Sequence, residues 1–516
     1  MSIESGIGAV GFRRIASIIK EIESATEIYF IPTDNLYSLK SHLFPSQIKS
    51  LNKNELINIS KHLADSDLIA FSSMTASSKY VEKISEYIKK INPATYIIWG
   101  GIHPTLYPNE SLKYVDAICV GEGEIPIKQF IKKYLKGKNF TDTPNFWFKE
   151  KNFIKQNPSL PLIDPKLLSQ FPLPYNGLDC SIYDIKQHQF RQFNKYDYTT
   201  YNGLLYRTLW TLGCPFNCAY CANDSFIKID PGYRKLRFPN VNHIINEIKQ
   251  AIKVHPYIRT IAFYDDNFVA LPLPIIQKFC QKYKKEIDLP FVVFGFHPNL
   301  VDKEKIRLLA KAGMNRTRMG IQSGAQNTLK FFNRPTTIEK IIESTTILAN
   351  AAIKYRMIPP AYDIISDIPI ESNKDIYETL QLIHRLKKPF TLTVFSLRIF
   401  PKTQLYGYVQ KNPVLKRYFK NSSYLDTRMT FNNILLYLLA TFEIPNFIFK
   451  KLSKFAIHPK NRTKEYPTLF NVVKIIYLTK RGIDHLSHFD FSTITGKWIF
   501  YVWKIRYQLI EKKLRF

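Results

Sequence analysis

The chain has 516 residues, too many for a single compact core, so we expect two to four domains. Its 45% hydrophobic and 22% charged residues are typical of globular proteins and exclude a largely disordered chain. A total of 73 Lys and Arg against 42 Asp and Glu gives a net charge of +31, which attracts nucleic acid, acidic lipid headgroups or phosphorylated metabolites without selecting among them.

Cysteine content and hydropathy bear on the cellular compartment. Six cysteines in a chain of this length are not the dense framework of a secreted disulfide-rich protein. The first ten residues lack the basic start and apolar run of a signal peptide, and no stretch of 18 uninterrupted apolar residues predicts a membrane-spanning helix. We therefore expect a cytoplasmic protein with free thiols.

Residues 1–140 alternate short apolar runs with amphipathic stretches of helical length. This alternation predicts a doubly wound, Rossmann-like α/β domain with a parallel sheet. Residues 35–60 are interpreted as an irregular insert. The expected strands are 27–32, 67–73, 95–101 and a run from residue 116, and the expected helices are 12–23, 79–91 and a segment ending near residue 135.

Three further regions follow. Residues 141–205 show little periodicity and contain a proline-marked stretch, so we interpret them as a linker. In residues 206–410 the β–α alternation resumes, which predicts a partial β/α (TIM-like) barrel. Residues 411–516 are basic and aromatic and are expected to be helical. The expected barrel strands are 204–212, 260–266, 291–296, 316–322, 362–368 and 390–397.

The most specific motif is a C-x3-C-x2-C array formed by Cys214, Cys218 and Cys221, directly after the first expected barrel strand. Loops after strands build the active face of a β/α barrel, and Pro215 disfavours a helix through the first two cysteines. Three thiolates can bind three corners of a four-iron cluster and leave the fourth iron open. The alternatives are structural cysteines or a zinc site, but the sequence offers no second CxxC or HxxxH pair to complete one.

This array, with an aromatic residue before its last cysteine, resembles the radical S-adenosylmethionine (SAM) superfamily. The resemblance continues in matching order through 264–268, 296–324, 363–369 and 400–406, about 200 residues in all. It implies a 4Fe-4S cluster that binds SAM and cleaves it to a 5′-deoxyadenosyl radical. The family usually has glycine where this chain has Lys402.

The same resemblance implies that SAM is bound by Asp265, Asp266, Gln322 and Ser323. From the residues alone, the two acids could equally cap a helix. The Gln322 and Ser323 side chains could equally satisfy backbone groups in a turn.

Polar and glycine residues follow three successive strands of the N-terminal domain, where open α/β sheets bind cofactors. Residues 5–135 resemble the cobalamin-binding domain fused to one branch of radical SAM enzymes. The D-x-H-x-x-G motif that places a histidine beneath cobalt does not occur here. His103 could serve cobalt or only order its own turn, and Glu122 could cap the next helix. The resemblance implies cobalamin binding by Ser72, Thr75, Gly100, Gly101, His103, Gly121, Glu122 and Gly123.

The last 116 residues carry 21 Lys and Arg against 6 Asp and Glu, together with many aromatic residues. Such a segment could lie in the membrane interface, could cover a lipophilic substrate, or could be a helical cap with a solvated basic face. We see no recognisable nucleic-acid-binding module and do not expect a nucleic-acid partner.

We therefore expect a cobalamin-dependent radical SAM enzyme that methylates, or otherwise modifies, an unactivated carbon. Its expected partners are a small-molecule or lipophilic substrate, a reducing donor such as flavodoxin or ferredoxin, and the membrane surface. A tRNA methylthiotransferase-like enzyme is an alternative, but it would need a second cysteine trio upstream, where residues 1–150 contain only Cys119, and a small all-β domain after the barrel. A non-catalytic protein that binds the same cofactors is the other alternative.

Overall fold

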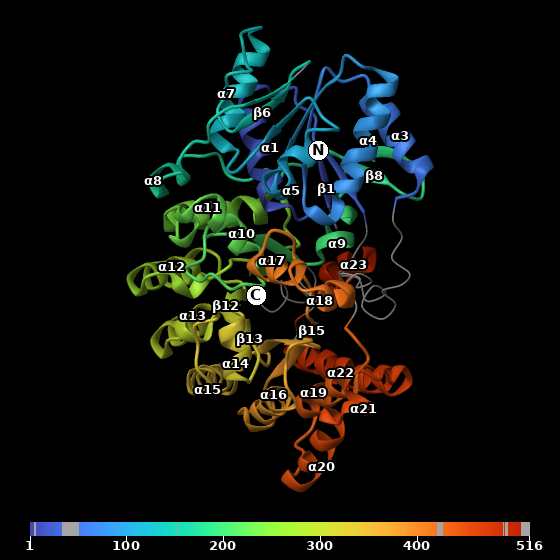
Figure 1. The fold of residues 1–516 in the computed structure, drawn as a ribbon. Coiled ribbons are helices and arrows are strands. Elements are labelled where there is room, and N and C mark those ends of the chain that lie inside the picture. Colours follow the sequence, from blue (N-terminus) through green and yellow to red (C-terminus); the bar gives the residue numbers. More distant parts are fainter. Residues whose placement is uncertain are drawn as a thin grey trace. The chain divides into compact units, whose positions relative to one another are not determined.

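The computed structural model describes residues 1–4, 7–33, 51–151, 153–419, 427–488, 490 and 494–506. The chain forms two compact units. The first comprises Met1–Arg207, Asn242–Arg259 and Ser492–Phe516, and the second comprises Thr208–Val241 and Thr260–Phe491 (Figure 1).

The first unit is built on a nine-stranded sheet of order β7-β6-β5-β4-β3-β1-β2-β8-β9. The neighbours within the central part of this order, β5-β4-β3-β1-β2-β8, all pair in parallel. The strands are β1 (Ser2–Glu4), β2 (Tyr29–Pro32), β3 (Leu68–Ser73), β4 (Tyr96–Gly100), β5 (Ala117–Cys119), β6 (Phe146–Lys149), β7 (Ile154–Gln156), β8 (Ser181–Asp184) and β9 (Gln189–Gln192).

Helices cover both faces of this sheet because its strands are apolar on both faces. Ile97 and Trp99 of β4 join one core cluster with α3 (Lys53–Leu63) and α4 (Ser78–Ile91). The intervening residue, Ile98, joins the opposite cluster with α1 (Val10–Ile22) and α7 (Glu124–Leu135). Figure 1 shows α3 beside α4. The predicted doubly wound domain is thus confirmed.

The predicted irregular insert was partly wrong. Residues 53–63 form α3, which begins with a capping box in which Asn52 and Glu55 satisfy each other's backbone N–H groups. Residues 34–50 of the insert lie outside the described residues.

The segment 141–205, predicted to be a linker, instead contains β6 to β9, α8 (Pro165–Leu168) and α9 (Lys195–Asn202). Its strands extend the sheet at both edges. They have three or four residues and several polar side chains, so they lack the periodicity by which buried strands are found.

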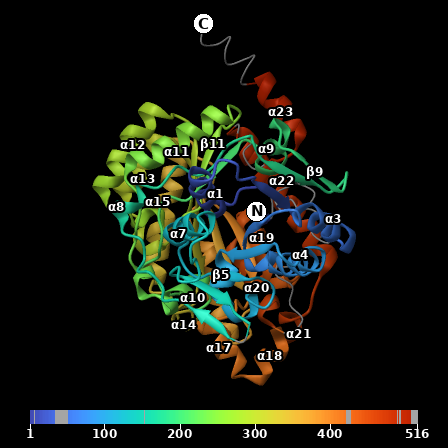
Figure 2. The same cartoon turned by 90° about the horizontal axis from the view of Figure 1, so that it is seen from above.

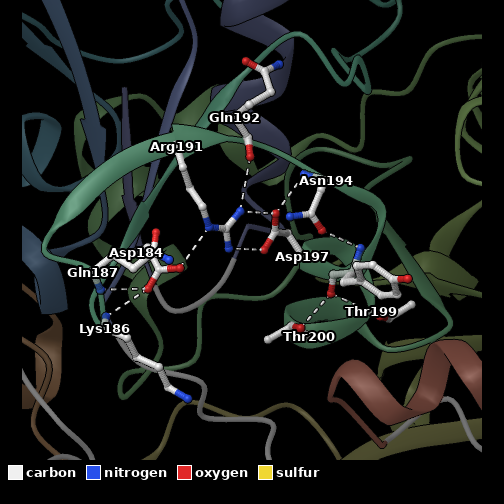
Figure 3. Close-up of polar contacts among 10 residues, drawn as sticks. Asp184, Lys186, Gln187, Arg191, Gln192, Asn194, Asp197, Thr199 and Thr200 are labelled. Carbon is white, nitrogen blue, oxygen red and sulfur yellow. Dashed lines mark hydrogen bonds and ion pairs between the residues drawn. The ribbon is translucent and has the colours of Figure 1, made fainter.

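Arg191 on β9 joins the β8–β9 hairpin to α9 (Figure 3). Its guanidinium donates to Asp184 at 2.9 Å and forms a bidentate pair with Asp197 at 2.6 and 2.7 Å. Asp197 also completes a capping box with Asn194 at the start of α9. These contacts fix the turn between the edge hairpin and the helix.

The second sheet has the order β10-β11-β12-β13-β14-β15, with β11 to β15 paired in parallel. All six predicted strands exist, and the partial barrel is confirmed. They are β10 (Leu205–Thr208), β11 (Thr260–Phe263), β12 (Phe291–Phe296), β13 (Met314–Gln322), β14 (Ala361–Ser366) and β15 (Thr391–Ser396).

Helices connect these strands and cover the outside of the sheet. Figure 2 shows α12 (Leu273–Glu286), α13 (Lys303–Ala312) and α15 (Ile338–Tyr355) following one another along one side. The remaining connections are α10 (Ala222–Ile229), α11 (Val241–Val254), α14 (Gln326–Phe331) and α16 (Asn373–Arg385).

The described residues after β15 form helices and no strand, as predicted. The nearly apolar α19 is buried along most of its length and packs on α16, α20 and α22. No described helix is long and apolar enough to cross a bilayer. The helices are α17 (Gln404–Gln410), α18 (Pro413–Phe419), α19 (Phe431–Thr441), α20 (Asn446–Ile457), α21 (Pro459–Arg462), α22 (Pro467–Ser487) and α23 (Lys497–Trp503).

Candidate active site

The three cysteines lie in the loop between β10 and α10, which is irregular as predicted. Gly213 opens the loop with φ of +91°, and a Cβ there would lie 2.6 Å from the Lys235 carbonyl oxygen. Only glycine fits this turn without backbone movement. Cys221 then immediately precedes α10.

Cys214, Cys218 and Cys221 all line one cavity of about 320 Å³ in the second unit. Among the described residues, no three His, Cys, Asp or Glu side chains are placed to hold a metal ion together. Cysteine sulfurs are the ligands of iron–sulfur clusters, so the donor set fits one.

Cys218 is buried, and Cys214 and Cys221 are partly buried. Burial raises the pKa of Cys214 to about 11 and that of Cys221 to about 12. A thiol must lose its proton to bind iron, and metal cations supply the positive charge that drives this loss. The free thiols are therefore protonated near neutral pH.

Arg334, which was not predicted, lies directly against the cysteine loop. Its buried guanidinium donates to Cys218 Sγ at 3.6 Å, to the Tyr220 hydroxyl at 3.2 Å and to the Gly320 carbonyl oxygen. Arg334 therefore places a positive charge next to a cysteine sulfur in this cavity. No local motif marks it, because 116 residues separate it from Cys218.

The structure separates the four predicted SAM residues into two pairs. Asp266 and Gln322 line the cavity. Asp265 instead accepts backbone N–H groups of Trp210 at 3.3 Å and Thr211 at 2.5 Å, so it ties the end of β11 to the chain leading into the cysteine loop.

Ser323 also lies outside the cavity lining. Its hydroxyl contacts the Thr379 hydroxyl at 3.1 Å and accepts the Ala325 N–H at 3.1 Å, as the turn interpretation of this residue predicts. Gln322 has φ of +75°, a left-handed conformation that costs energy in a residue with a side chain.

Gly295 sets the distance between two strand ends at the cavity wall. Its φ is +74°, and a Cβ would lie 2.0 Å from the Asp265 carbonyl oxygen. The glycine therefore allows β12 to pass directly against the end of β11, beside Asp266.

Aromatic and charged side chains complete the cavity. The His297 ring stacks on Phe216 at 3.7 Å, and Tyr264 stacks on Phe294 at 4.5 Å. Burial, and then the Arg334 charge, lower the pKa of His297 to about 2, so this imidazole is neutral. Its buried Nε2 has no hydrogen-bond partner among the described residues, which leaves it available to a ligand.

Arg318 and Asp363 form an ion pair at the cavity wall, with Nε at 2.7 and 3.0 Å from the two carboxylate oxygens. They lie on the neighbouring strands β13 and β14.

Elsewhere in this unit, Lys402 has φ of +68°. A positive φ at this position is easiest for glycine, which is the residue that the family usually has there. In this chain Lys402 adopts the same left-handed conformation.

The predicted cobalamin residues lie together at the carboxyl ends of three neighbouring strands, β3, β4 and β5. Ser72 and Gly100 end their strands, and Thr75 begins a short 3-10 turn. Gly101 has φ of +102°, and a Cβ there would lie 3.0 Å from the Ser73 carbonyl oxygen. Gly121 has φ of +84° and Gly123 precedes α7. This glycine-lined edge fits close approach by a large planar cofactor.

His103 is held by its neighbours rather than projecting freely. Its ring is stacked between Trp99 at 5.1 Å and Tyr107 at 5.0 Å, and burial lowers its pKa. The Glu122 carboxylate accepts the Ile163 N–H at 2.8 Å. These contacts order the strand-end loops, while the buried His103 Nδ1 has no hydrogen-bond partner among the described residues.

Two family models match the chain. The radical SAM superfamily model matches residues 208–383, and the B12-binding domain model matches residues 50–131. The radical SAM domain implies a 4Fe-4S cluster and SAM, and the B12-binding domain implies cobalamin.

Relatives cover about two thirds of the chain at low identity. An uncharacterized methyltransferase of Pyrococcus horikoshii is 22% identical over 68% of this chain and 71% of its own. The bacteriochlorophyllide d C-8(2)-methyltransferase of Chlorobaculum tepidum is 23% identical over 66% of this chain and 68% of its own.

Solved structures share the fold. The radical SAM methyltransferase TsrM from Kitasatospora setae, with cobalamin and a [4Fe-4S] cluster bound, has a TM-score of 0.60 and 13% identity over 80% of this chain and 74% of that one. The cobalamin-dependent radical SAM enzyme OxsB has a TM-score of 0.57 and 16% identity over 99% of this chain and 76% of that one. The chain thus carries a radical SAM domain and, N-terminal to it, a B12-binding domain.

Proposed function

We propose that this enzyme transfers a methyl group to an unactivated carbon of a small-molecule substrate. The observation that carries the proposal is the cavity at the barrel strand ends, bordered by three cysteine thiols, in a chain that also has a B12-binding domain. Relatives named as methyltransferases support it.

Different residues of the chain would hold each cofactor and the substrate. The three cysteines would hold the cluster, and the glycine-lined edge of the first sheet would hold cobalamin. When bound, the cluster supplies an electron for SAM cleavage and cobalamin supplies a methyl carrier. Asp266, Gln322 and the neutral His297 offer hydrogen bonds to SAM or substrate, and the aromatic pairs exclude water from the reacting groups.

The substrate and electron donor are further parts of the proposal. The aromatic lining, with Phe216, Phe294 and Phe296, favours a substrate with a large apolar surface. A low-potential protein such as flavodoxin or ferredoxin would supply the electron. A cytoplasmic location stays a prediction.

Cyclisation is the second candidate reaction. The anaerobic magnesium-protoporphyrin IX monomethyl ester cyclase of Rubrivivax gelatinosus is 24% identical over 56% of this chain. This relative is named as a cyclase and not as a methyltransferase. Identification of the reaction product would distinguish methylation from cyclisation.

The test is anaerobic reconstitution with iron, sulfide and cobalamin. We expect about four irons per chain, a 4Fe-4S absorption spectrum and reductant-dependent formation of 5′-deoxyadenosine from SAM. The triple variant Cys214→Ala, Cys218→Ala, Cys221→Ala should lose both cluster and SAM cleavage. Cys280→Ala, a buried cysteine on α12 outside the cavity, is the matched control and should keep both.

Three results would contradict the proposal. About eight irons per chain would favour a methylthiotransferase-like enzyme. Cofactor binding without any SAM turnover would favour a non-catalytic protein. SAM cleavage in the triple variant would exclude the assigned cluster ligands.

A further inference from the structure

Helix α22 in the C-terminal part of the second unit has two apolar faces. Its inner face is buried through Phe470, Val473 and Tyr477, and the Tyr477 hydroxyl donates to the Leu392 carbonyl oxygen of β15 at 2.5 Å. These contacts fix the orientation of the helix on the barrel. Its outer face is therefore directed away from the core of the unit.

The outer face of α22 is an aliphatic stripe without a charged residue. The spacing of its members by one, three, four or seven positions places them on one side of a helix. Their exposed fractions run from 44% to 60%. The members are Leu469, Val472, Ile475, Ile476, Ile483 and Leu486.

Helix α20 presents a second exposed face that mixes apolar and basic side chains. Phe449, Ser453 and Ala456 are buried, and Phe449 stacks on His384 at 4.3 Å. On the opposite side Phe447 is 65% exposed and Ile448 is 37% exposed. Lys450, Lys451 and Lys454 are exposed beside them.

The charge around these two faces distinguishes between a second copy of the chain, a nucleic acid and a bilayer as the partner. Residues 431–487 contain nine Lys and Arg against three Asp and Glu. A second copy of this chain would bring the same basic residues face to face, which is unfavourable. A nucleic acid would leave the aliphatic stripe in water. An anionic bilayer accepts both, because apolar side chains enter the headgroup region while lysines meet the acidic headgroups.

We propose that α20 and α22 dock this protein on the surface of membranes that contain anionic lipid. The helices lie in the interface and do not span it, in keeping with the absence of a bilayer-spanning helix among the described residues. A docked enzyme would meet lipophilic substrates where they are concentrated. The docking itself does not depend on the reaction proposed above.

Co-sedimentation of the full-length holoenzyme with vesicles tests this inference. We expect binding to phosphatidylcholine vesicles that contain phosphatidylglycerol, weaker binding to phosphatidylcholine alone, and loss of binding at high salt. The variant Val472→Asp, Ile475→Asp, Ile483→Asp should bind at least about tenfold more weakly. Lys450→Gln, Lys451→Gln, Lys454→Gln should lose the preference for phosphatidylglycerol.

Ile353→Asp is the matched control, because Ile353 lies on α15 in the same unit and is 59% exposed. It should bind vesicles as the wild type does. All variants should cleave SAM in solution at the wild-type rate, which separates failure of docking from failure of the proposed function. Wild-type protein that ignores anionic vesicles, or an aspartate variant that binds them unchanged, would overturn the inference. So would an aspartate variant whose only change is conversion of a dimer to a monomer.

Discussion

At the scale of single residues, Arg334 has the most direct expected effect on the cluster. Hydrogen bonds and positive charge near cluster sulfurs favour the reduced state. Arg334 contacts Cys218 Sγ and is buried, so solvent screens its charge little. Its contact is with the sulfur of the proposed ligand Cys218, and we therefore describe it as a positioning residue.

We expect Arg334→Gln to lower the midpoint potential of the reconstituted cluster. At a fixed donor potential, the ratio of reduced to oxidised cluster should fall about tenfold, which corresponds to about 59 mV for one electron. Arg334→Lys, which keeps the charge, should shift the potential less. The measurement is a redox titration followed by electron paramagnetic resonance.

Lys330→Gln provides the control, since it removes an exposed positive charge on α14. Its potential should match the wild type. If Arg334→Gln leaves the potential unchanged and only lowers thermal stability, Arg334 has a purely structural role.

Glu371 should make the free energy of unfolding depend on pH, and a single substitution can test this. Burial raises the pKa of this carboxyl from 4.5 to about 7, and it accepts a hydrogen bond from Thr328 at 2.9 Å. Because the folded state holds this proton more tightly than the unfolded state, the stabilisation is complete below pH 4.5 and is lost as pH rises through about 7.

Glu371→Gln keeps the acceptor and removes the titration. The variant should gain up to about 3 kcal/mol over the wild type above pH 7 and almost nothing near pH 4.5. Chemical denaturation at the two pH values measures the difference. A constant difference between the proteins would show that Glu371 does not titrate in this range.

At the scale of elements, the bidentate Arg191–Asp197 pair connects an edge hairpin to α9 (Figure 3). Asp197→Ala should lower the free energy of unfolding by about 2 kcal/mol, because it leaves a half-buried guanidinium without its main acceptor. Asp184→Asn, which removes the more exposed acceptor, should cost less than about 1 kcal/mol. Equal losses in thermal denaturation would contradict this role for Asp197.

The elements that could be predicted from the sequence are those in which burial imposes a regular spacing of apolar residues. Barrel strands such as β11 and β12 are apolar over several residues, and helices such as α4 repeat buried positions at Val81, Ile84 and Ile88. Edge strands such as β9 have no such pattern because one side meets solvent, so the segment containing β6 to β9 was interpreted as a linker.

The same limit applies to the candidate site. The cysteine trio has a fixed spacing within eight residues, so its sequence alone predicts a shared site. Asp265 and Asp266 are adjacent, and only the fold shows that one holds backbone N–H groups while the other lines the cavity. Arg334 and Cys218 meet only through the return of the chain after β13, which no local pattern encodes.

At the scale of the whole molecule, one chain combines a glycine-lined strand edge in a B12-binding domain with a thiol-bordered cavity in a radical SAM domain. The second unit adds a helical C-terminal part whose outer faces are apolar and basic. Each part has a chemistry that can be measured separately: cluster loading, cobalamin loading and vesicle binding.

The most direct test of the central claim follows the methyl group of SAM. The anaerobically purified, reconstituted protein is incubated with SAM bearing a deuterated methyl group, cobalamin and a reductant, and the small molecules are analysed by mass spectrometry. We predict two uses of SAM: reductive cleavage of one molecule to 5′-deoxyadenosine and methionine, and transfer of the deuterated methyl group of a second molecule to the cobalamin fraction, which leaves S-adenosylhomocysteine. The triple cysteine variant should form no 5′-deoxyadenosine. Stoichiometric zinc at the three cysteines, with the methyl group of SAM left in place, would contradict the account.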